Sequence, residues 1–462
     1  MYIKNSINQK ALFNMVQKIK EVGSLQHFAI SKNGETLVNF SINPYLDTDS
    51  KQLFSLSKTF TSMAIGKAYD EGLLSLDDKL VDIFKDFLPE KLGNMVDELK
   101  VKDLLSMQTG HSHCVMQEIV ASKNIIEKFL SLDLEYKPGT FFMYNNGASL
   151  ILSFMINILT KKSIVEYLKP LFEALEITNY HCDQIGGVCL GAAGMHLDCE
   201  SILKFGNFLL NKGKVNGKQI ISEEYINQAI KPHASTSHDN RCDWSKGYGY
   251  HLWMADGGYR CDGMLGQYAI IYPEEKIVVA AISNVSDMQK EVDAFKEFIK
   301  VMNNTSLVES LEDKINSLYS ISDINSKVLD FDKKTIKLQD NKLGINEIIL
   351  INENNSLKVE VNGVNAFSLL AGYKEYKNSK FIAGGIKANV FVGMPLMKEE
   401  VIVSSYYLYN EVLEVIMLNH NTPLTQKMII DFNKNEIVIN NHILYEEKSK
   451  WKRYYLLQPV EQ

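Results

Sequence analysis

The stretch FSLSKTFTSMAIGKAYDEG, residues 54–72, sets a polar pair at the start of a long apolar segment. Ser55 and Lys58 are three residues apart, a spacing that brings both side chains to one face of a helix. Gly72 follows the last apolar residues and is a typical C-terminal cap. The pattern therefore predicts a helix that begins near Ser55 and ends at Gly72.

A serine in the first turn of a helix is well placed to act as a nucleophile. Unpaired backbone N–H groups and the helix dipole favour negative charge there, such as a developing oxyanion. A lysine kept out of water at that end has its pKa lowered from about 10.4 towards neutrality, so it can accept the serine proton. The alternative is an ordinary polar helix start with a solvated lysine. A second match to the spacing, SKWK from Ser449 to Lys452, is discarded because no apolar helix follows it.

A second candidate segment is YKPGTFFMYNNGASLILSFMINIL at residues 136–159. It contains Tyr144-Asn145-Asn146 between a Pro-Gly turn and an apolar helix. A tyrosine hydroxyl beside the serine can relay the proton to a leaving group, which is the role predicted for Tyr144. Asn146 is predicted to hold a substrate amide and to orient Lys58. The alternative is a loop tyrosine followed by an asparagine that caps the helix.

A third segment, YRCDGMLGQYAIIYP at residues 259–273, ends in a strand pattern. Gly263 is predicted to let a substrate lie against the strand edge. The backbone N–H of Met264 is predicted to be an oxyanion donor beside that of Ser55. A β-turn would explain Asp262 and Gly263 equally well.

In this order and spacing, the three segments resemble the serine β-lactamase and penicillin-binding-protein superfamily, specifically its class C β-lactamase and esterase branch. The similarity covers roughly residues 20–300 and includes the flanks VKDLLSMQTG and GAAGMHLDCESILKFGNFLLNKGKVNGKQIIS. It implies an α/β (α+β) fold, an antiparallel five-stranded-type sheet flanked by helices with a helical subdomain inserted. It also implies that Ser55 is acylated, that Lys58 is the base, and that Tyr144 shuttles the proton and helps to activate the deacylating water. No metal or organic cofactor is implied.

One motif departs from the family. Cys261-Asp262-Gly263 stands where β-lactamases and penicillin-binding proteins usually have Lys-Thr-Gly and many relatives have His-x-Gly. The missing cation helps those enzymes to bind a substrate carboxylate. Arg260 and Arg241 are the candidate anion contacts, although Arg260 is expected on the opposite strand face from Cys261. An ester or amide hydrolase therefore fits better than a β-lactamase.

Two alternatives remain. One is a β-lactamase or a D-Ala carboxypeptidase-type penicillin-binding protein whose substrate anion is held by an arginine. The other is a sensor that is acylated without turnover or is no longer acylated. The intact Ser55, Lys58 and Tyr144 argue against a sensor.

The chain is predicted to contain two domains, a hydrolase domain at 1–302 and an antiparallel β domain at 325–462. A helical connector at 303–324 is predicted to join them. Within the first, an Asn33-Gly34 turn predicts a β-hairpin. Alternating apolar residues and Asn-rich turns predict the second as a meander or small barrel. The β domain is expected to shape substrate access or to mediate association into a homo-oligomer.

The composition and net charge of the chain argue against some classes of function. The 462 residues carry a net charge of −7, so no basic field favours nucleic acid or an anionic membrane. Six single cysteines without a CxxC pair indicate reduced thiols. The first residues lack a secretory pattern, and the apolar run 148–159 is too short to span a bilayer. We expect a cytoplasmic enzyme acting on a small ester, amide or peptide-like substrate.

Two histidine-cysteine motifs and an aromatic cluster complete the candidates. HSHC at residues 111–114 and HLDC at residues 196–199 match no strong zinc pattern. The cluster is expected to pack in the core or to form a wall of the acyl pocket, and it consists of Trp244, Tyr248, Tyr250 and Trp253.

Overall fold

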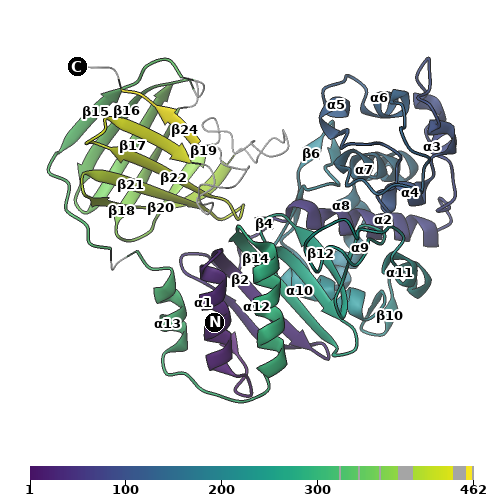
Figure 1. The fold of residues 1–462 in the computed structure, drawn as a ribbon, viewed down its shortest axis with the longest axis horizontal. Coiled ribbons are helices and arrows are strands. Elements are labelled where there is room, and N and C mark those ends of the chain that lie inside the picture. Colours follow the sequence, from purple (N-terminus) through teal and green to yellow (C-terminus); the bar gives the residue numbers. More distant parts are fainter. Residues whose placement is uncertain (322–323, 342–343, 364–365, 383–398, 441–453, 460–462) are drawn as a thin grey trace. The chain divides into compact units, whose positions relative to one another are not determined.

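The computed structural model describes residues 1–321, 324–341, 344–363, 366–382, 399–440 and 454–459 (Figure 1). The chain divides into two units, each described by itself below. The first consists of residues 1–4, 27–40 and 52–282, and the second of residues 5–26, 41–51 and 283–462.

An antiparallel sheet forms the framework of the first unit, and three of its strands, β2, β3 and β14, include residues of the second. Its order is β1-β3-β2-β14-β13-β12-β11. The strands are β1 (Tyr2–Ile3), β2 (Gly23–Lys32), β3 (Glu35–Ser41), β11 (Trp253–Ala255), β12 (Gly258–Gly263), β13 (Gln267–Tyr272) and β14 (Ile277–Val285). The five long strands match the expected five-stranded-type sheet. The two short strands at the edges, β1 and β11, were not predicted.

The turns of this sheet follow from local sequence. Asn33 and Gly34 both have positive φ, 54° and 79°, as a two-residue hairpin turn between β2 and β3 requires. Central strand β14 is buried at every residue, and its first part, IVVAAI at residues 277–282, is the continuous apolar run typical of a buried strand.

Helix α2 (Ser57–Asp70) is the central helix of the first unit, because all but three of its residues are buried. It ends at Asp70, and Gly72, two residues later, has a φ of 69°, the left-handed conformation that is common just after a helix. Helix α7 (Asn146–Thr160) contacts α2, and it also contacts α4 (Val101–Leu105), α5 (Met116–Val120) and α6 (Ile125–Ser131) to form the helical subdomain. The remaining helices of this unit are α3 (Leu80–Ile83), α8 (Ile164–Tyr167), α9 (Lys169–Ala174), α10 (Cys199–Leu210) and α11 (Glu223–Ala229).

Several short strands pair with one another outside the main sheet. β4 (Lys51–Gln52), β8 (Met195–Leu197) and β5 (His181–Cys182) pair in the order β4-β8-β5. β6 (Gln184–Ile185) and β7 (Val188–Cys189) form a hairpin, as do β9 (Lys214–Val215) and β10 (Lys218–Gln219).

Where the structure describes it, the second unit combines three helices with an all-β region. Helix α1 (Gln9–Lys20) contacts both α12 (Met288–Val301) and α13 (Leu311–Leu318). The ten-stranded sheet, at the green-to-yellow end of the chain in Figure 1, contains β15 (Lys333–Lys337), β16 (Ile345–Glu353), β17 (Ser356–Gly363), β18 (Phe367–Tyr373), β19 (Lys377–Ile382), β20 (Glu399–Tyr409), β21 (Val412–Asn419), β22 (Thr425–Asp431), β23 (Glu436–Asn440) and β24 (Tyr454–Leu457).

The β region has its own hydrophobic core, drawn from residues 329–457. Neighbouring strands pair antiparallel except β18 and β20, which are parallel. The expected C-terminal antiparallel β domain is therefore present with one parallel pair. Among the described residues, no helix has the length and apolar character needed to cross a bilayer.

Candidate active site

Ser55 and Lys58 meet at the start of α2. Ser55 lies in a 3-10 turn, Phe54–Leu56, that leads directly into the helix. The distance between Lys58 Nζ and Ser55 Oγ is 3.0 Å, which is a hydrogen bond. Ser55 is partly exposed whereas Lys58 is only 1% exposed, so the hydroxyl is accessible and its partner is not.

Burial lowers the pKa of Lys58 to about 7, because a charged ammonium loses its hydration there. Its second polar contact is the carbonyl oxygen of Ala192, 2.7 Å from Nζ. A neutral Lys58 amine can donate to that carbonyl and accept the hydroxyl proton of Ser55 at the same time. The geometry thus allows lysine to act as a base near neutral pH.

Tyr144 completes the group. It precedes α7, and Lys58 Nζ lies 4.8 Å from the centre of its ring. Burial raises the pKa of Tyr144, and a hydrogen bond with Ser55 partly opposes that shift. The structure therefore brings together the three residues that the sequence nominated as catalytic, from segments about ninety positions apart.

Aromatic rings hold Tyr144 in place. Trp253 stacks on it with ring centres 5.8 Å apart, and Tyr248 meets it edge-on at 6.1 Å. Two members of the predicted aromatic cluster are thus neighbours of Tyr144. The other two lie elsewhere: Tyr250 stacks on His233, and Trp244 contacts two arginines.

The asparagines beside Tyr144 have distinct contacts. Asn145 caps α7, since its side-chain oxygen accepts from the backbone N–H of Gly147 at 3.0 Å. Asn146 is partly exposed, and its backbone N–H donates to Cys114 Sγ at 3.3 Å. The predicted contacts of the Asn146 side chain with a substrate amide and with Lys58 stay predictions.

Gly263 ends β12 where that strand contacts the turn containing Ser55. A Cβ atom at this position would lie 2.0 Å from the carbonyl oxygen of Leu53. Glycine is therefore needed because the two backbones touch, a reason that differs from the expected approach of a substrate. Met264 follows and is partly exposed, and its oxyanion role stays a prediction.

Cys261 and Asp262 point in different directions. Burial raises the pKa of the Cys261 thiol to about 12, and the thiol hydrogen-bonds to Thr59 of α2. Asp262 is paired with Arg260, whose Nε lies 2.9 Å from its carboxylate. Neither residue supplies the cation that the family's usual motif would place here.

Both candidate arginines form ion pairs with aspartates of the same chain. Arg260 has no exposed surface, and its guanidinium also lies 3.6 Å from Asp243. Arg241 forms two hydrogen bonds with Asp239, at 2.9 and 2.6 Å. Arg260 is enclosed, and its predicted contact with a substrate stays a prediction, as does that of Arg241.

Two features of the site were missed by sequence reasoning. Phe54 has a positive φ of 48°, an uncommon conformation for a bulky residue, directly before the serine. The Ala192 carbonyl lies in the small-residue run GAAGM. The sequence feature that could have indicated this close approach to α2 is Gly191, where a Cβ would lie 2.7 Å from Thr61 Oγ1.

A metal site has no support in the part of the chain that the structure describes, where no three His, Cys, Asp or Glu side chains gather suitably. In the HSHC motif, His111 hydrogen-bonds to Thr109 and His113 to Glu118. In the HLDC motif, His196 hydrogen-bonds to Asp183.

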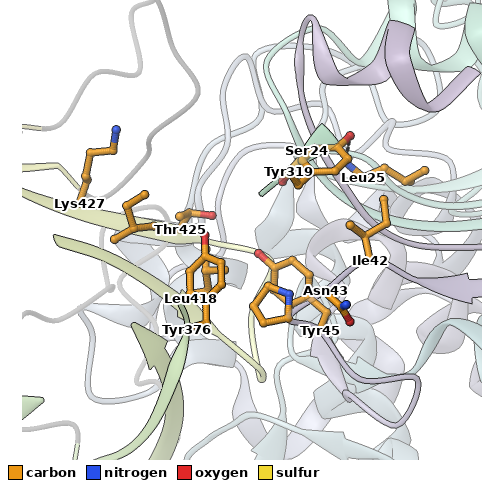
Figure 2. Close-up of a pocket in the computed structure, with 12 residues that line it drawn as sticks. Ser24, Leu25, Ile42, Asn43, Tyr45, Tyr319, Tyr376, Leu418, Thr425 and Lys427 are labelled. Carbon is orange, nitrogen blue, oxygen red and sulfur yellow. Dashed lines mark hydrogen bonds between the residues drawn. The ribbon is translucent and has the colours of Figure 1, made fainter. Parts of the chain in front are cut away.

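The second unit contains a cavity of about 140 Å³. Figure 2 draws the residues that line it. Its lining is mainly apolar and aromatic and includes Tyr45, Tyr319 and Tyr376. Ser55, Lys58 and Tyr144 belong to the first unit and do not line it.

The chain belongs to the beta-lactamase family, whose model matches residues 27–299. Protein flp of Staphylococcus aureus strain NCTC 8325 is 30% identical over 174 residues, which are 33% of this chain and 34% of that protein. The match thus spans about a third of the length of this curated relative. Family membership confirms the resemblance at the level of the family, and the class C and esterase branch stays a prediction.

Solved structures share the fold. The octameric penicillin-binding protein homologue from Pyrococcus abyssi is 17% identical, with a TM-score of 0.52 over 97% of this chain and 99% of that one. A putative 6-aminohexanoate-dimer hydrolase from Bacillus anthracis is 18% identical, with a TM-score of 0.51 over 62% of this chain and 80% of that one. The expected fold class is therefore confirmed.

Proposed function

We propose that the chain is a serine hydrolase that cleaves an ester or amide bond through a covalent acyl-enzyme on Ser55. The observation that carries the proposal is the 3.0 Å contact between Ser55 Oγ and a buried Lys58 whose pKa is about 7. A base with a pKa near the working pH is half neutral and can take the serine proton as the hydroxyl attacks.

The steps follow from the arrangement of the three side chains. Lys58 accepts the Ser55 proton while Oγ adds to the substrate carbonyl, and the backbone N–H groups of Ser55 and Met264 are proposed to stabilise the oxyanion. Tyr144, hydrogen-bonded to Ser55, passes a proton to the leaving group. Lys58 then passes its proton to Tyr144, which resets the pair. Water attacks the acyl carbonyl and gives one proton to the Lys58–Tyr144 pair, and Ser55 Oγ takes that proton back as the acyl group leaves.

An ester or amide without a required carboxylate fits this site better than a β-lactam. Cys261 replaces the cation of the family motif, and Arg260 is enclosed and paired with Asp262. Arg241 is the other candidate for the arginine-assisted alternative, and its guanidinium is already bound to Asp239. That alternative predicts rapid opening of a chromogenic cephalosporin, lost in Arg260→Ala or Arg241→Ala.

Intact-mass spectrometry during reaction with p-nitrophenyl butyrate tests the proposal. We expect a butyryl adduct that appears within the first turnovers, maps to Ser55 and disappears as the ester is consumed. An adduct that persists for hours would favour the sensor alternative. An adduct on another residue, with Ser55 unmodified, would contradict the proposed mechanism.

We also propose that the chain associates into a homo-oligomer. The solved relative that matches 97% of this chain is described as an octamer. Light scattering of the purified chain is expected to give a mass above the monomer's 52.5 kDa.

A further inference from the structure

The carbonyl that holds Lys58 belongs to a tight turn, residues 190–194. Ala192 is the middle residue of this turn, and its carbonyl oxygen accepts a hydrogen bond from Lys58 Nζ at 2.7 Å. The turn is closed by the carbonyl oxygen of Leu190, which accepts from the N–H of Gly194 at 2.9 Å. A residue that fixes this turn therefore also fixes the polar partner of the proposed base.

Asp183 holds both ends of the turn through its main chain. Its N–H donates to the Gly194 carbonyl at 2.8 Å, and its carbonyl accepts from the Leu190 N–H at 2.7 Å. Asp183 also lies directly before the hairpin of β6 and β7, which ends at Cys189, one residue before the turn. A displacement of the Asp183 main chain would therefore displace the turn with it.

The side chain of Asp183 is anchored separately, to strands beside the serine. Its Oδ2 accepts from the Gln52 amide Nε2 at 3.3 Å and lies 3.1 Å from His196 Nε2. Its Oδ1 lies 3.4 Å from Nε2 of His181. Asp183, Gln52 and His196 are each 5% exposed or less, so the carboxylate depends on these partners for its polar contacts.

These partners belong to the backbone that carries Ser55. Gln52 ends β4 and precedes Leu53, whose N–H donates to the Met195 carbonyl at 2.8 Å. Met195 lies in β8, directly before the histidine that contacts the carboxylate, and its own N–H donates to Ser57 Oγ at 3.0 Å. The carboxylate thus contacts both strands that are tied to the residues around the serine.

We propose that Asp183 is a positioning residue that holds the Ala192 carbonyl, and with it Lys58, at the place where the base meets the serine. The main chain of Asp183 is bound to the lysine side of this pair, and its carboxylate is bound to the serine side. Removing the carboxylate leaves the buried Gln52 amide without its acceptor, which favours a shift of the strands and the turn relative to one another. The catalytic consequence rests on the proposed function, whereas the change at Lys58 does not.

A loosened turn is expected to alter the protonation of Lys58. Burial is the main cause that lowers the pKa of this lysine to about 7, and the turn is part of what encloses it. Water that enters beside a displaced turn stabilises the ammonium form, so the pKa should rise towards the ordinary lysine value. A displaced base also takes the serine proton less efficiently.

The titration of Lys58 itself tests the proposal. In the full chain labelled with ¹³C at lysine Cε, the Lys58 signal is identified by its absence in Lys58→Met and is followed by NMR between pH 5 and 10. In Asp183→Ala we expect its midpoint about one pH unit above that of the wild type. Tyr144 and His251 do not interfere, because burial raises the pKa of the first and lowers that of the second to about 3. A midpoint that is unchanged or lower would overturn the proposal.

Asp103 offers a matched control. It is another buried aspartate of the first unit, 6% exposed, and its carboxylate accepts from the Lys100 N–H at the start of α4 at 2.9 Å. Asp103→Ala removes a carboxylate from a helix start, so it should reduce stability and leave the Lys58 midpoint where it is in the wild type. Equal shifts in the two variants would indicate general loosening of the fold and would overturn a specific role for Asp183.

Asp183→Asn serves if Asp183→Ala does not fold. The amide has the shape of the carboxylate and keeps one acceptor oxygen while losing the other. We expect the Lys58 midpoint to rise in this variant by about half a pH unit. An unchanged midpoint in a folded Asp183→Asn would also overturn the proposal.

Ester turnover tests the catalytic consequence. With p-nitrophenyl butyrate, kcat should fall about tenfold in Asp183→Ala while KM changes little. Two histidines contact Asp183, and histidine ordinarily titrates near neutral pH, so the NMR signal rather than the rate profile reports on Lys58. A shifted Lys58 midpoint with unchanged kcat would overturn the positioning role. A wild type without Ser55-dependent turnover would contradict the proposed function, and the titration would still decide whether Asp183 controls the surroundings of Lys58.

Discussion

Lys58 is the residue on which the proposed chemistry depends. An exposed lysine would stay protonated at neutral pH and could not act as a base, whereas this one is enclosed and has a pKa of about 7. The sequence predicted that shift only conditionally, from helical spacing. The partner that fixes the amine, the Ala192 carbonyl, lies 134 residues away, and only the tertiary fold brings it there.

The pH dependence of kcat/KM follows from this pKa. The rate should rise with pH as Lys58 loses its proton, with a midpoint near 7, and then level off. Stopped-flow or plate assays with a neutral ester between pH 5 and 9 measure it. A profile that still rises steeply at pH 9 would indicate a lysine with an ordinary pKa.

Substitution separates the base from the proton shuttle. Lys58→Met keeps the length of the side chain but removes the amine, and we expect a loss of at least about 100-fold in kcat. Tyr144→Phe keeps the ring over Lys58 and removes only the hydroxyl, so kcat should also fall while KM changes little. Circular dichroism serves as the folding control, and near wild-type kcat in Lys58→Met would refute its role.

At the level of elements, local patterns predicted strands, turns and the main helices because each depends on neighbouring residues. The Asn33-Gly34 turn and the Gly72 cap are examples. The same rules did not predict the 3-10 turn Phe54–Leu56 that contains Ser55, or the positive φ of Phe54 within it. They also could not show that Arg260 would be enclosed, since burial depends on the loop carrying Asp243 and Trp244.

The contact between β12 and the serine turn makes Gly263 sensitive to a single added methyl. Gly263→Ala would place Cβ against the Leu53 carbonyl, so we expect a loss of about 2 kcal/mol or more in unfolding free energy, together with reduced activity. Urea denaturation and ester turnover measure the two effects.

Gly72→Ala is the matched control, because it has no clash but a φ of 69°. It should cost about 1 kcal/mol and leave turnover per folded molecule unchanged. Equal stability and activity of Gly263→Ala and the wild type would contradict the close approach.

Glu291 on α12 links stability to pH in the second unit. It is fully buried beside Ser283, and burial raises its pKa well above the ordinary glutamate value. A carboxyl whose folded pKa is raised contributes stability at low pH that is lost as pH rises. Glu291→Gln should therefore remove part of the decline in unfolding free energy between pH 5 and 8, as measured by denaturant titration. A steeper decline in the variant would contradict this.

At the scale of the whole molecule, the C-terminal β region has its own hydrophobic core, drawn from residues 329–457. Since a domain needs such a core to fold independently, a fragment of residues 325–462 should fold alone, with a strand-type circular dichroism spectrum and a cooperative unfolding transition. A fragment without cooperative unfolding would show that the predicted boundary at 325 does not delimit a domain.

The hydrolysis rate of p-nitrophenyl butyrate, compared between the wild type and Ser55→Ala, tests the central claim most directly. The account predicts turnover by the wild type and its loss in the variant, because Ser55 supplies the attacking oxygen held by Lys58. Equal rates for the two proteins would contradict it and leave the Ser55–Lys58 pair without a role in this hydrolysis.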